Sequence, residues 1–202
     1  WTMQSRASFF NATVYRRNLT RFAPLWILYF VLWLVIMPLS VLSQGNSPYF
    51  NLGDLQRTVL YAALRYGNLI NLVYAALIAM ALYSWYFHPK SVNAMAALPI
   101  RREAFFLTNL LTALTVSLVP NLLIALLSWG AASMTGLPGC SAAAQWLGIV
   151  LLQFLFYYGA ASFCAAIAGQ LLALPALYLL LNFAAVVLNS VTVAVLSTFV
   201  YG

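Results

Sequence analysis

The sequence predicts an all-α protein, a polytopic bundle of transmembrane helices. From Ala104 to Gly202 the chain contains no Lys, Arg, Asp, Glu or His, and a charge-free half of this length suits only lipid, because a soluble domain needs charges on its surface. Hydrophobic residues make up 65% of the chain, charged residues 5%, and the mean hydropathy is +0.94. The apolar stretches are continuous rather than alternating with polar residues, which favours helices over a barrel.

Hydropathy divides the chain into one surface helix and five spans. A transmembrane helix needs roughly 20 mostly apolar residues, because the hydrocarbon layer is ~30 Å thick and each residue rises ~1.5 Å. We expect a single transmembrane domain over residues 1–202, with a surface helix over residues 7–22 and spans over residues 24–43, 68–87, 104–131, 144–169 and 172–188.

The first of these elements, residues 7–22, mixes aromatic and aliphatic side chains with Arg16, Arg17 and Arg21. That mixture suits a helix lying in the membrane surface, with its cations toward anionic head groups and its apolar side chains below. A positive flank that only fixes the topology is the alternative interpretation.

The last apolar run, from Leu171 to Gly202, is too long for one perpendicular span, since 32 residues would reach about 48 Å as a helix. We expect a break at Asn189 and Ser190, followed by a re-entrant or interfacial segment over residues 191–201. The chain begins with Trp1 and Thr2 ahead of a methionine and stops within this segment, so we expect a piece of a longer protein.

The cations predict the orientation, because positive loops stay in the cytoplasm. Only Arg57 and Arg65 fall in the loop expected over residues 44–67. The other cations share the opposite side of the membrane, and they are Arg6, Arg16, Arg17, Arg21, Lys90, Arg101 and Arg102. A multi-pass protein with a cytoplasmic N-terminus is therefore predicted.

The sequence contains few residues that could catalyse a reaction. The chain has one histidine, His88, and two acids, Asp54 and Glu103, and the topology puts Asp54 across the membrane from the other two. Motifs of zinc proteases, serine hydrolases and phosphate-binding loops do not occur. We expect no enzyme activity, catalytic residue, metal or cofactor in this chain. Ion-coupled carriers place ionisable residues within their spans, and the predicted spans contain none.

The spans do contain neutral amides, which must find partners in lipid. An amide that faces the interior either lines a substrate pathway or joins two helices, and the second interpretation is at least as good as the first. The candidate pathway-lining residues are Asn71, Asn109, Asn121, Gln153 and Asn182.

The segment over residues 88–103 carries the most specific pattern. A proline ends the second span, Ser91 can cap a short helix, and Pro99 stops that helix. Apolar residues recur at a spacing of three along this helix and would form an apolar ridge on one side of it. In the cytosol such a ridge is expected to be buried against a partner. Arginines and an acid follow at the start of the third span, where they suit phosphates or acids of a partner and the positive helix end. An interfacial turn with anchoring side chains is the alternative interpretation.

At this segment the chain resembles a family. The stretch SVNAMAALPIRRE, followed by FFLTNLL, resembles the cytoplasmic loop of type 2 ATP-binding-cassette (ABC) exporter permeases, particularly bacterial members of the multidrug or antimicrobial-peptide kind. The opening SFFNATVYRRNLTRFAPLWILYFVLWLVIMPL is similar to the start of these permeases. The likeness covers most of the chain through short, mostly apolar motifs.

The resemblance implies a membrane subunit of six helices per half-transporter, in which a coupling helix docks on a cytosolic ABC ATPase that holds ATP and Mg. It places the coupling role on Ser91, Val92, Asn93, Met95, Leu98, Pro99, Arg101, Arg102 and Glu103. It also implies a second permease half, as a homodimer or heterodimer, and the bacterial cytoplasmic (inner) membrane. A sixth span is absent from this sequence.

Two functions remain open from the sequence. The first is a permease subunit of an ATP-driven exporter, which couples hydrolysis in a partner ATPase to the export of a hydrophobic or amphipathic substrate. The second is a non-transporting assembly, sensor or immunity protein that binds a cytosolic partner through the same loop. Membrane lipids are partners in either case, and nucleic acid is not an expected partner.

Overall fold

The computed structural model describes residues 12–45, 47, 49–87 and 102–199. Its described part is helical, without strands, and consists of α1 (Ala12–Arg21), α2 (Ala23–Ile36), α3 (Pro38–Gly45), α4 (Leu52–Tyr61), η1 (Ala62–Tyr66), α5 (Gly67–Tyr83), η2 (Ser84–Phe87), α7 (Arg102–Met134), α8 (Cys140–Ile167) and α9 (Ala173–Phe199). The predicted all-α polytopic bundle is confirmed. Five helical segments are long and apolar enough to cross a membrane: Ala23–Gly45, Leu52–Phe87, Ala104–Met134, Cys140–Ile167 and Ala173–Phe199.

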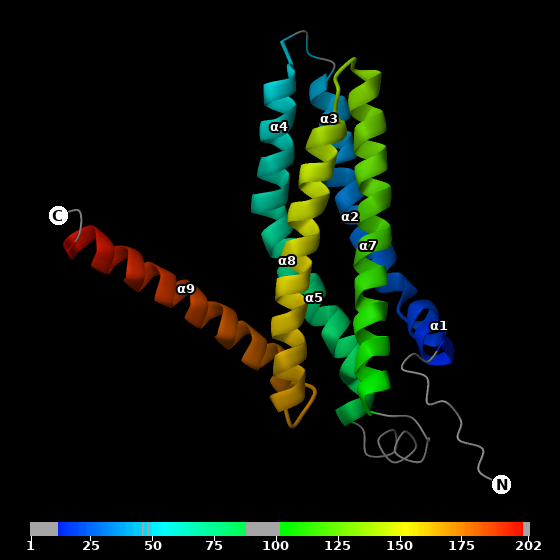
Figure 1. Cartoon of the computed structure of the whole chain (residues 1–202), viewed down its shortest axis with the longest axis vertical. Helices are drawn as coiled ribbons and strands as arrows, with labels where there is room; N and C mark the ends of the chain where they lie inside the picture. The colour runs from blue at the N-terminus through cyan, green and yellow to red at the C-terminus, as the bar shows by residue number, and fades with distance from the viewer. Residues whose placement is uncertain (1–11, 46, 48, 88–101, 200–202) are drawn as a thin grey trace.

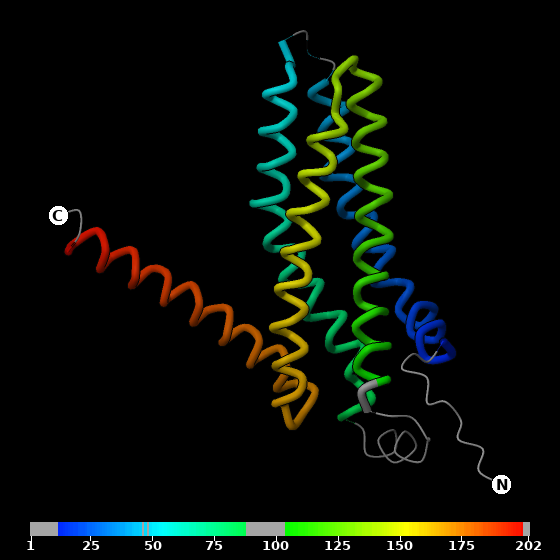
Figure 2. Tube along the Cα trace, in the orientation of Figure 1, coloured from blue at the N-terminus to red at the C-terminus, as the bar shows by residue number. Residues whose placement is uncertain are grey.

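Four of these segments form an upright bundle, and the fifth leaves it (Figure 1). The bundle contains α2 with α3, α4 with α5, α7 and α8, whereas α9 starts beside the end of α8 and diverges (Figure 2). The short helix α1 packs on α7 at the same end, which we call the α1 end. The α3–α4 and α7–α8 connections lie at the opposite end.

The second span begins much earlier than predicted. Instead of a loop over residues 44–67, the structure has one continuous helix from Leu52 to Phe87. Its start is fixed by a capping box, in which the Asn51 side chain accepts from the Asp54 N–H at 3.0 Å and the Asp54 carboxylate accepts from the Asn51 N–H at 3.3 Å. Arg57 and Arg65 therefore lie on a helix of the bundle rather than in a loop.

This long helix includes a π-helical turn, η1, where the hydrogen bonds run from i to i+5 and the Gly67 N–H donates to the Ala62 carbonyl. Apolar residues on one side of α4 and η1 are buried against α8, at positions typical of an amphipathic helix. These residues are Leu55, Val59, Ala62 and Ala63.

The predicted break at Asn189 and Ser190 is wrong, because α9 continues through both residues to Phe199. The Ser190 hydroxyl donates to the Val186 carbonyl one turn earlier at 3.0 Å, so its polarity is satisfied inside the helix. The helix of 27 residues measures about 40 Å, and inclination of its axis lets such a length fit the ~30 Å hydrocarbon layer. Residues 191–199 thus extend the fifth span and form no separate re-entrant segment.

The bundle core is built from aromatic rings. Trp33 and Trp146 meet edge to face with centroids 4.9 Å apart, and Tyr29 stacks on Tyr74 at 3.9 Å. Trp33 and Trp146 have no exposed surface. These contacts join α2, α5 and α8 at the middle of the bundle, where the polar groups described next also lie.

Candidate functional site

A hydrogen-bonded network occupies the bundle centre, and its hub is Tyr29 of α2. The Tyr29 hydroxyl donates to Asn71 Oδ1 of α5 at 2.9 Å and accepts from Asn121 Nδ2 of α7 at 3.1 Å. Both asparagines are fully buried. A single hydroxyl thus joins three spans, at a depth where every polar group needs an internal partner.

The fourth span joins the network through Asn71 and Gln153. Asn71 Nδ2 donates to the Val150 carbonyl and lies within hydrogen-bond distance of Gln153 Oε1, both at 3.2 Å. Gln153 Nε2 in turn donates to the Ala63 carbonyl in η1 at 3.2 Å. Four spans are therefore tied together by side-chain amides, and one of these bonds holds the π-helical turn.

Three of the five predicted pathway amides, Asn71, Asn121 and Gln153, therefore belong to one network inside this chain. Their hydrogen bonds join helices, which is the alternative that the sequence left open. A role in lining a pathway stays a prediction. The hub itself was missed, although a tyrosine in the middle of an otherwise apolar span is a signal that polar partners face it.

The other two predicted amides lie elsewhere. Asn109 Oδ1 accepts from Asn18 Nδ2 of α1 at 3.3 Å, so this pair fastens α1 to α7. Asn182 Nδ2 donates to the Tyr178 carbonyl of its own helix at 2.8 Å. Asn189, also on α9, is exposed and makes no hydrogen bond with any residue that the structure describes.

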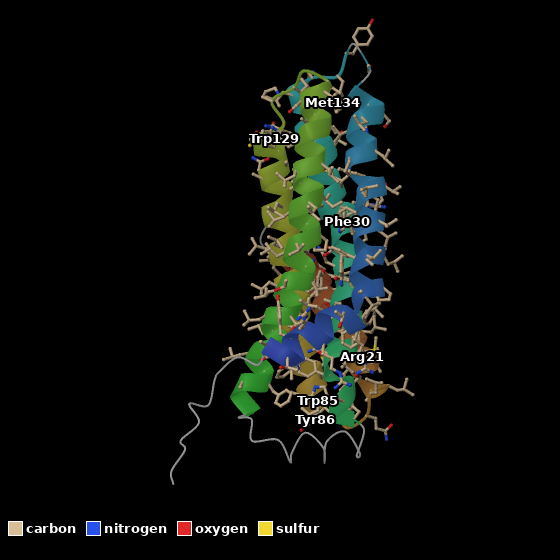
Figure 3. All side chains as sticks on the ribbon, turned by 90° about the vertical axis from the view of Figure 1, so that its right-hand side faces the viewer. Arg21, Phe30, Trp85, Tyr86, Trp129 and Met134 are labelled. Carbon is tan, nitrogen blue, oxygen red and sulfur yellow. The ribbon has the colours of Figure 1, made fainter. Side chains whose placement is uncertain are left out.

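The α1 end gathers the cations. Arg16, Arg17 and Arg21 are exposed on α1, whereas Leu19 of the same helix packs against the core. Figure 3 shows Arg21 at the same end of the molecule as Trp85 and Tyr86, with Trp129 and Met134 at the other. The structure thus gives residues 12–21 the two-faced helix that the sequence predicted, and residues 7–11 lie outside the described part.

The predicted coupling residues 91–101 lie outside the described residues. Arg102 and Glu103 begin α7, and nothing is described of their side chains. The two ends of the intervening chain are both placed, because η2 ends at Phe87 and α7 begins at Arg102, and both points lie at the α1 end (Figure 1). The described residues on both sides of this stretch therefore lie at the end of the bundle where α1 exposes its arginines.

Fold and composition together define a multi-pass α-helical membrane protein. Within the described residues, no group of three or more His, Cys, Asp or Glu side chains is placed to hold a metal ion. In comparisons with protein-family models, curated proteins and solved structures, the chain matches none of them.

Proposed function

We propose that this chain is the membrane-spanning permease subunit of an ATP-driven exporter of the type 2 ABC kind. The observation that supports the proposal is that η2 ends and α7 begins at the end of the bundle where α1 presents its arginines. The sequence SVNAMAALPIRRE, which begins in the interval between η2 and α7, predicts an apolar ridge followed by two arginines. A cytosolic ATPase is the partner that such a ridge would dock on.

The network gives this segment a way to act on the bundle. Helix α5 runs through η2 directly into the segment, and Asn71 of α5 bonds to α2 through Tyr29 and to α8 through Val150. A displacement of the segment by ATP binding in the partner would therefore move tied spans together rather than one helix alone. ATP and Mg belong to that partner, and this chain would supply no catalytic group.

Energy from ion gradients is a poor alternative source. Arg57 and Arg65 lie on a spanning helix, which differs from the sequence prediction, but arginine keeps its proton in proteins and cannot complete a protonation cycle. We propose a hydrophobic or amphipathic substrate, a second permease half, and a bacterial cytoplasmic membrane with the α1 end in the cytoplasm.

Co-purification of the ATPase tests the proposal. Met95→Asp and Leu98→Asp each place an unpaired charge on the ridge, which should cost several kcal/mol at a buried contact and release the partner. Ala97→Asp is the matched control, because on a helix over residues 92–98 it would lie opposite the ridge. Arg101→Ala and Arg102→Ala should weaken the complex less, since exposed ion pairs contribute ~1 kcal/mol or less.

We expect a cytosolic ATPase to co-purify with the wild type and Ala97→Asp, and to be lost from both ridge variants. Retention of an ATPase by Met95→Asp and Leu98→Asp would count decisively against a coupling helix. Capture of a partner without nucleotide-hydrolysing activity would instead favour the assembly, sensor or immunity protein.

A further inference from the structure

Arg65 lies well inside the length of the bundle. It follows Leu52 by 13 residues, about 20 Å along the helix, and precedes Tyr83, the last residue of α5, by 18 residues, about 27 Å. Two residues before it, the Ala63 carbonyl receives the bond from Gln153 at the bundle centre. The Arg65 side chain itself is exposed. Arg65 thus exposes a guanidinium on the outside of the bundle, within the segment Leu52–Phe87 that is long and apolar enough to span a membrane.

No acid of this chain can neutralise that charge. The chain has two acids, Asp54 and Glu103. Asp54 caps α4 and lies 11 residues, about 16 Å, from Arg65 along a continuous helix, whereas Glu103 begins α7 at the α1 end. Arg65 makes no ion pair or hydrogen bond with a described residue. A guanidinium on a spanning helix is stabilised by an anion or by water, and the described part of the chain brings no acid near Arg65, so an anion there would come from outside the chain.

The surroundings of Arg65 suit an amphiphile. Tyr61 and Tyr66, both exposed, meet edge to face at 5.8 Å on the same turn, and such rings accommodate both a polar head and an apolar tail. Asn68, three residues on, accepts from the Tyr157 hydroxyl of α8. One turn further, the Leu72 carbonyl accepts from Tyr178 of α9 at 3.0 Å.

The side of the helix that carries Arg65 therefore leads into the angle between α5, α8 and α9, which opens as α9 diverges (Figure 2). An open apolar groove of about 430 Å³ lies between α8 and α9. Its lining includes Cys164, two helical turns after Tyr157, and also Phe163, Ile167, Leu177, Leu181 and Leu188. The polar side chains near Arg65 are thus followed, toward the α1 end, by the apolar groove between α8 and α9.

We propose that Arg65 binds the anionic headgroup, a phosphate or a carboxylate, of a membrane amphiphile whose apolar tail lies in the angle between α5, α8 and α9. The planar guanidinium presents parallel donors to both kinds of anion. The same chemistry is available from a resident phospholipid and from cargo. That the amphiphile is cargo rests on the export function proposed above, whereas anion binding at Arg65 does not.

Binding is measured on the whole protein in nanodiscs, with a fluorescent phosphatidylglycerol as the probe and the phosphatidylcholine analogue as its zwitterionic counterpart. We expect Arg65→Gln to raise the Kd for the anionic probe about tenfold or more, as for loss of a charge-assisted hydrogen bond. Arg65→Lys, which keeps the charge but not the parallel donors, should bind with a Kd between those of the wild type and Arg65→Gln. Arg57→Gln on the same helix, one turn nearer the capped end than Tyr61, should bind as the wild type does.

Equal affinity of the wild type for the two probes, or unchanged binding by Arg65→Gln, would overturn the proposal. Retained binding by Arg65→Lys also shows that loss in Arg65→Gln is not a failure to fold. A second arm adds the ATPase and ATP and follows movement of the bound probe across the bilayer. Movement that Arg65→Gln abolishes identifies cargo, whereas binding without movement identifies a resident lipid, and the anion site stands in both. Absence of any bound ATPase would defeat the proposed export function and leave the binding result intact.

Discussion

Helix α7 of the upright bundle and helix α9 are equally apolar but differ in how much of each is buried. The most apolar stretch of α7 is 44% buried inside the molecule, whereas no residue of the corresponding stretch of α9 is buried. The amides differ in the same way, because Asn71 and Asn121 are fully buried with partners on other helices whereas Asn189 is exposed without one.

This difference shows that apolarity does not decide which helices associate in a membrane. Lipid tails solvate a leucine as well as another helix does, so association depends on fitted packing and on hydrogen bonds between helices. The bundle has both, in the rings around Trp33 and in the network around Tyr29. Helix α9 has its attachment near its start, through Leu174 and Tyr178, and little beyond.

Truncation of a phenylalanine should separate the two regions most. Phe154 of α8 is 1% exposed between Tyr74 and Tyr158, whereas Phe183 of α9 is 69% exposed. We expect Phe154→Ala to lower the free energy of unfolding by about 3 kcal/mol, because it leaves a cavity. Phe183→Ala should change it by less than about 0.5 kcal/mol. Unfolding in mixed micelles measures both, and similar losses would show that α9 is packed in the membrane.

Replacement of an amide should give the next largest contrast. Asn71→Leu removes bonds to Tyr29, Val150 and Gln153 and should lower the free energy of unfolding by about 2 kcal/mol, at ~0.6 kcal/mol or more for each bond between membrane helices. Asn189→Leu removes an amide without a described partner and should leave stability unchanged or slightly raised. The same unfolding measurement applies, and a loss from Asn189→Leu equal to that from Asn71→Leu would mean that Asn189 has a partner in the membrane.

Two glycines sharpen the comparison within the bundle. A Cβ at Gly67 would lie 2.9 Å from Gln153 Oε1, and Gln153 cannot yield without losing its bonds to Asn71 and Ala63. At Gly159 a Cβ would meet nothing within 4 Å. We expect Gly67→Ala to cost about 1 kcal/mol and Gly159→Ala to gain up to ~1 kcal/mol from helix propensity. Thermal unfolding in detergent shows whether each substitution raises or lowers stability. A gain in stability at both positions would contradict close packing of Gly67 against Gln153.

Hydropathy predicts the helices of this protein well and their connections less well. The spans near residues 24–43, 104–131 and 144–169 have counterparts within a few residues of the expected ends, because long apolar runs have one solution in lipid. The loop expected over residues 44–67 is mostly helix. The capping pair Asn51 and Asp54 was a readable signal for it, whereas the π-helical turn depends on contacts with Gln153 that no local pattern contains.

The candidate site was predictable only as a set of residue types. Amides in apolar spans had to face partners, and three of the five meet around Tyr29, but a linear sequence does not say which helices are neighbours. The expected break at Asn189 failed because Ser190 bonds to its own helix. Arg65 was assigned to a loop, and its place on a span became clear only when the helix was seen to start at Leu52.

Uptake of a labelled hydrophobic peptide into inverted membrane vesicles tests the central claim, that this chain and an ATPase form an exporter. Vesicles that hold the protein and a partner ATPase should accumulate the peptide with ATP, but not with a non-hydrolysable analogue, and Met95→Asp should abolish uptake while Ala97→Asp leaves it unchanged. Uptake should also persist when an ionophore collapses the proton and sodium gradients, because the arginines of the spans cannot cycle protons. Loss of uptake on adding the ionophore while ATP remains high would contradict an ATP-driven exporter.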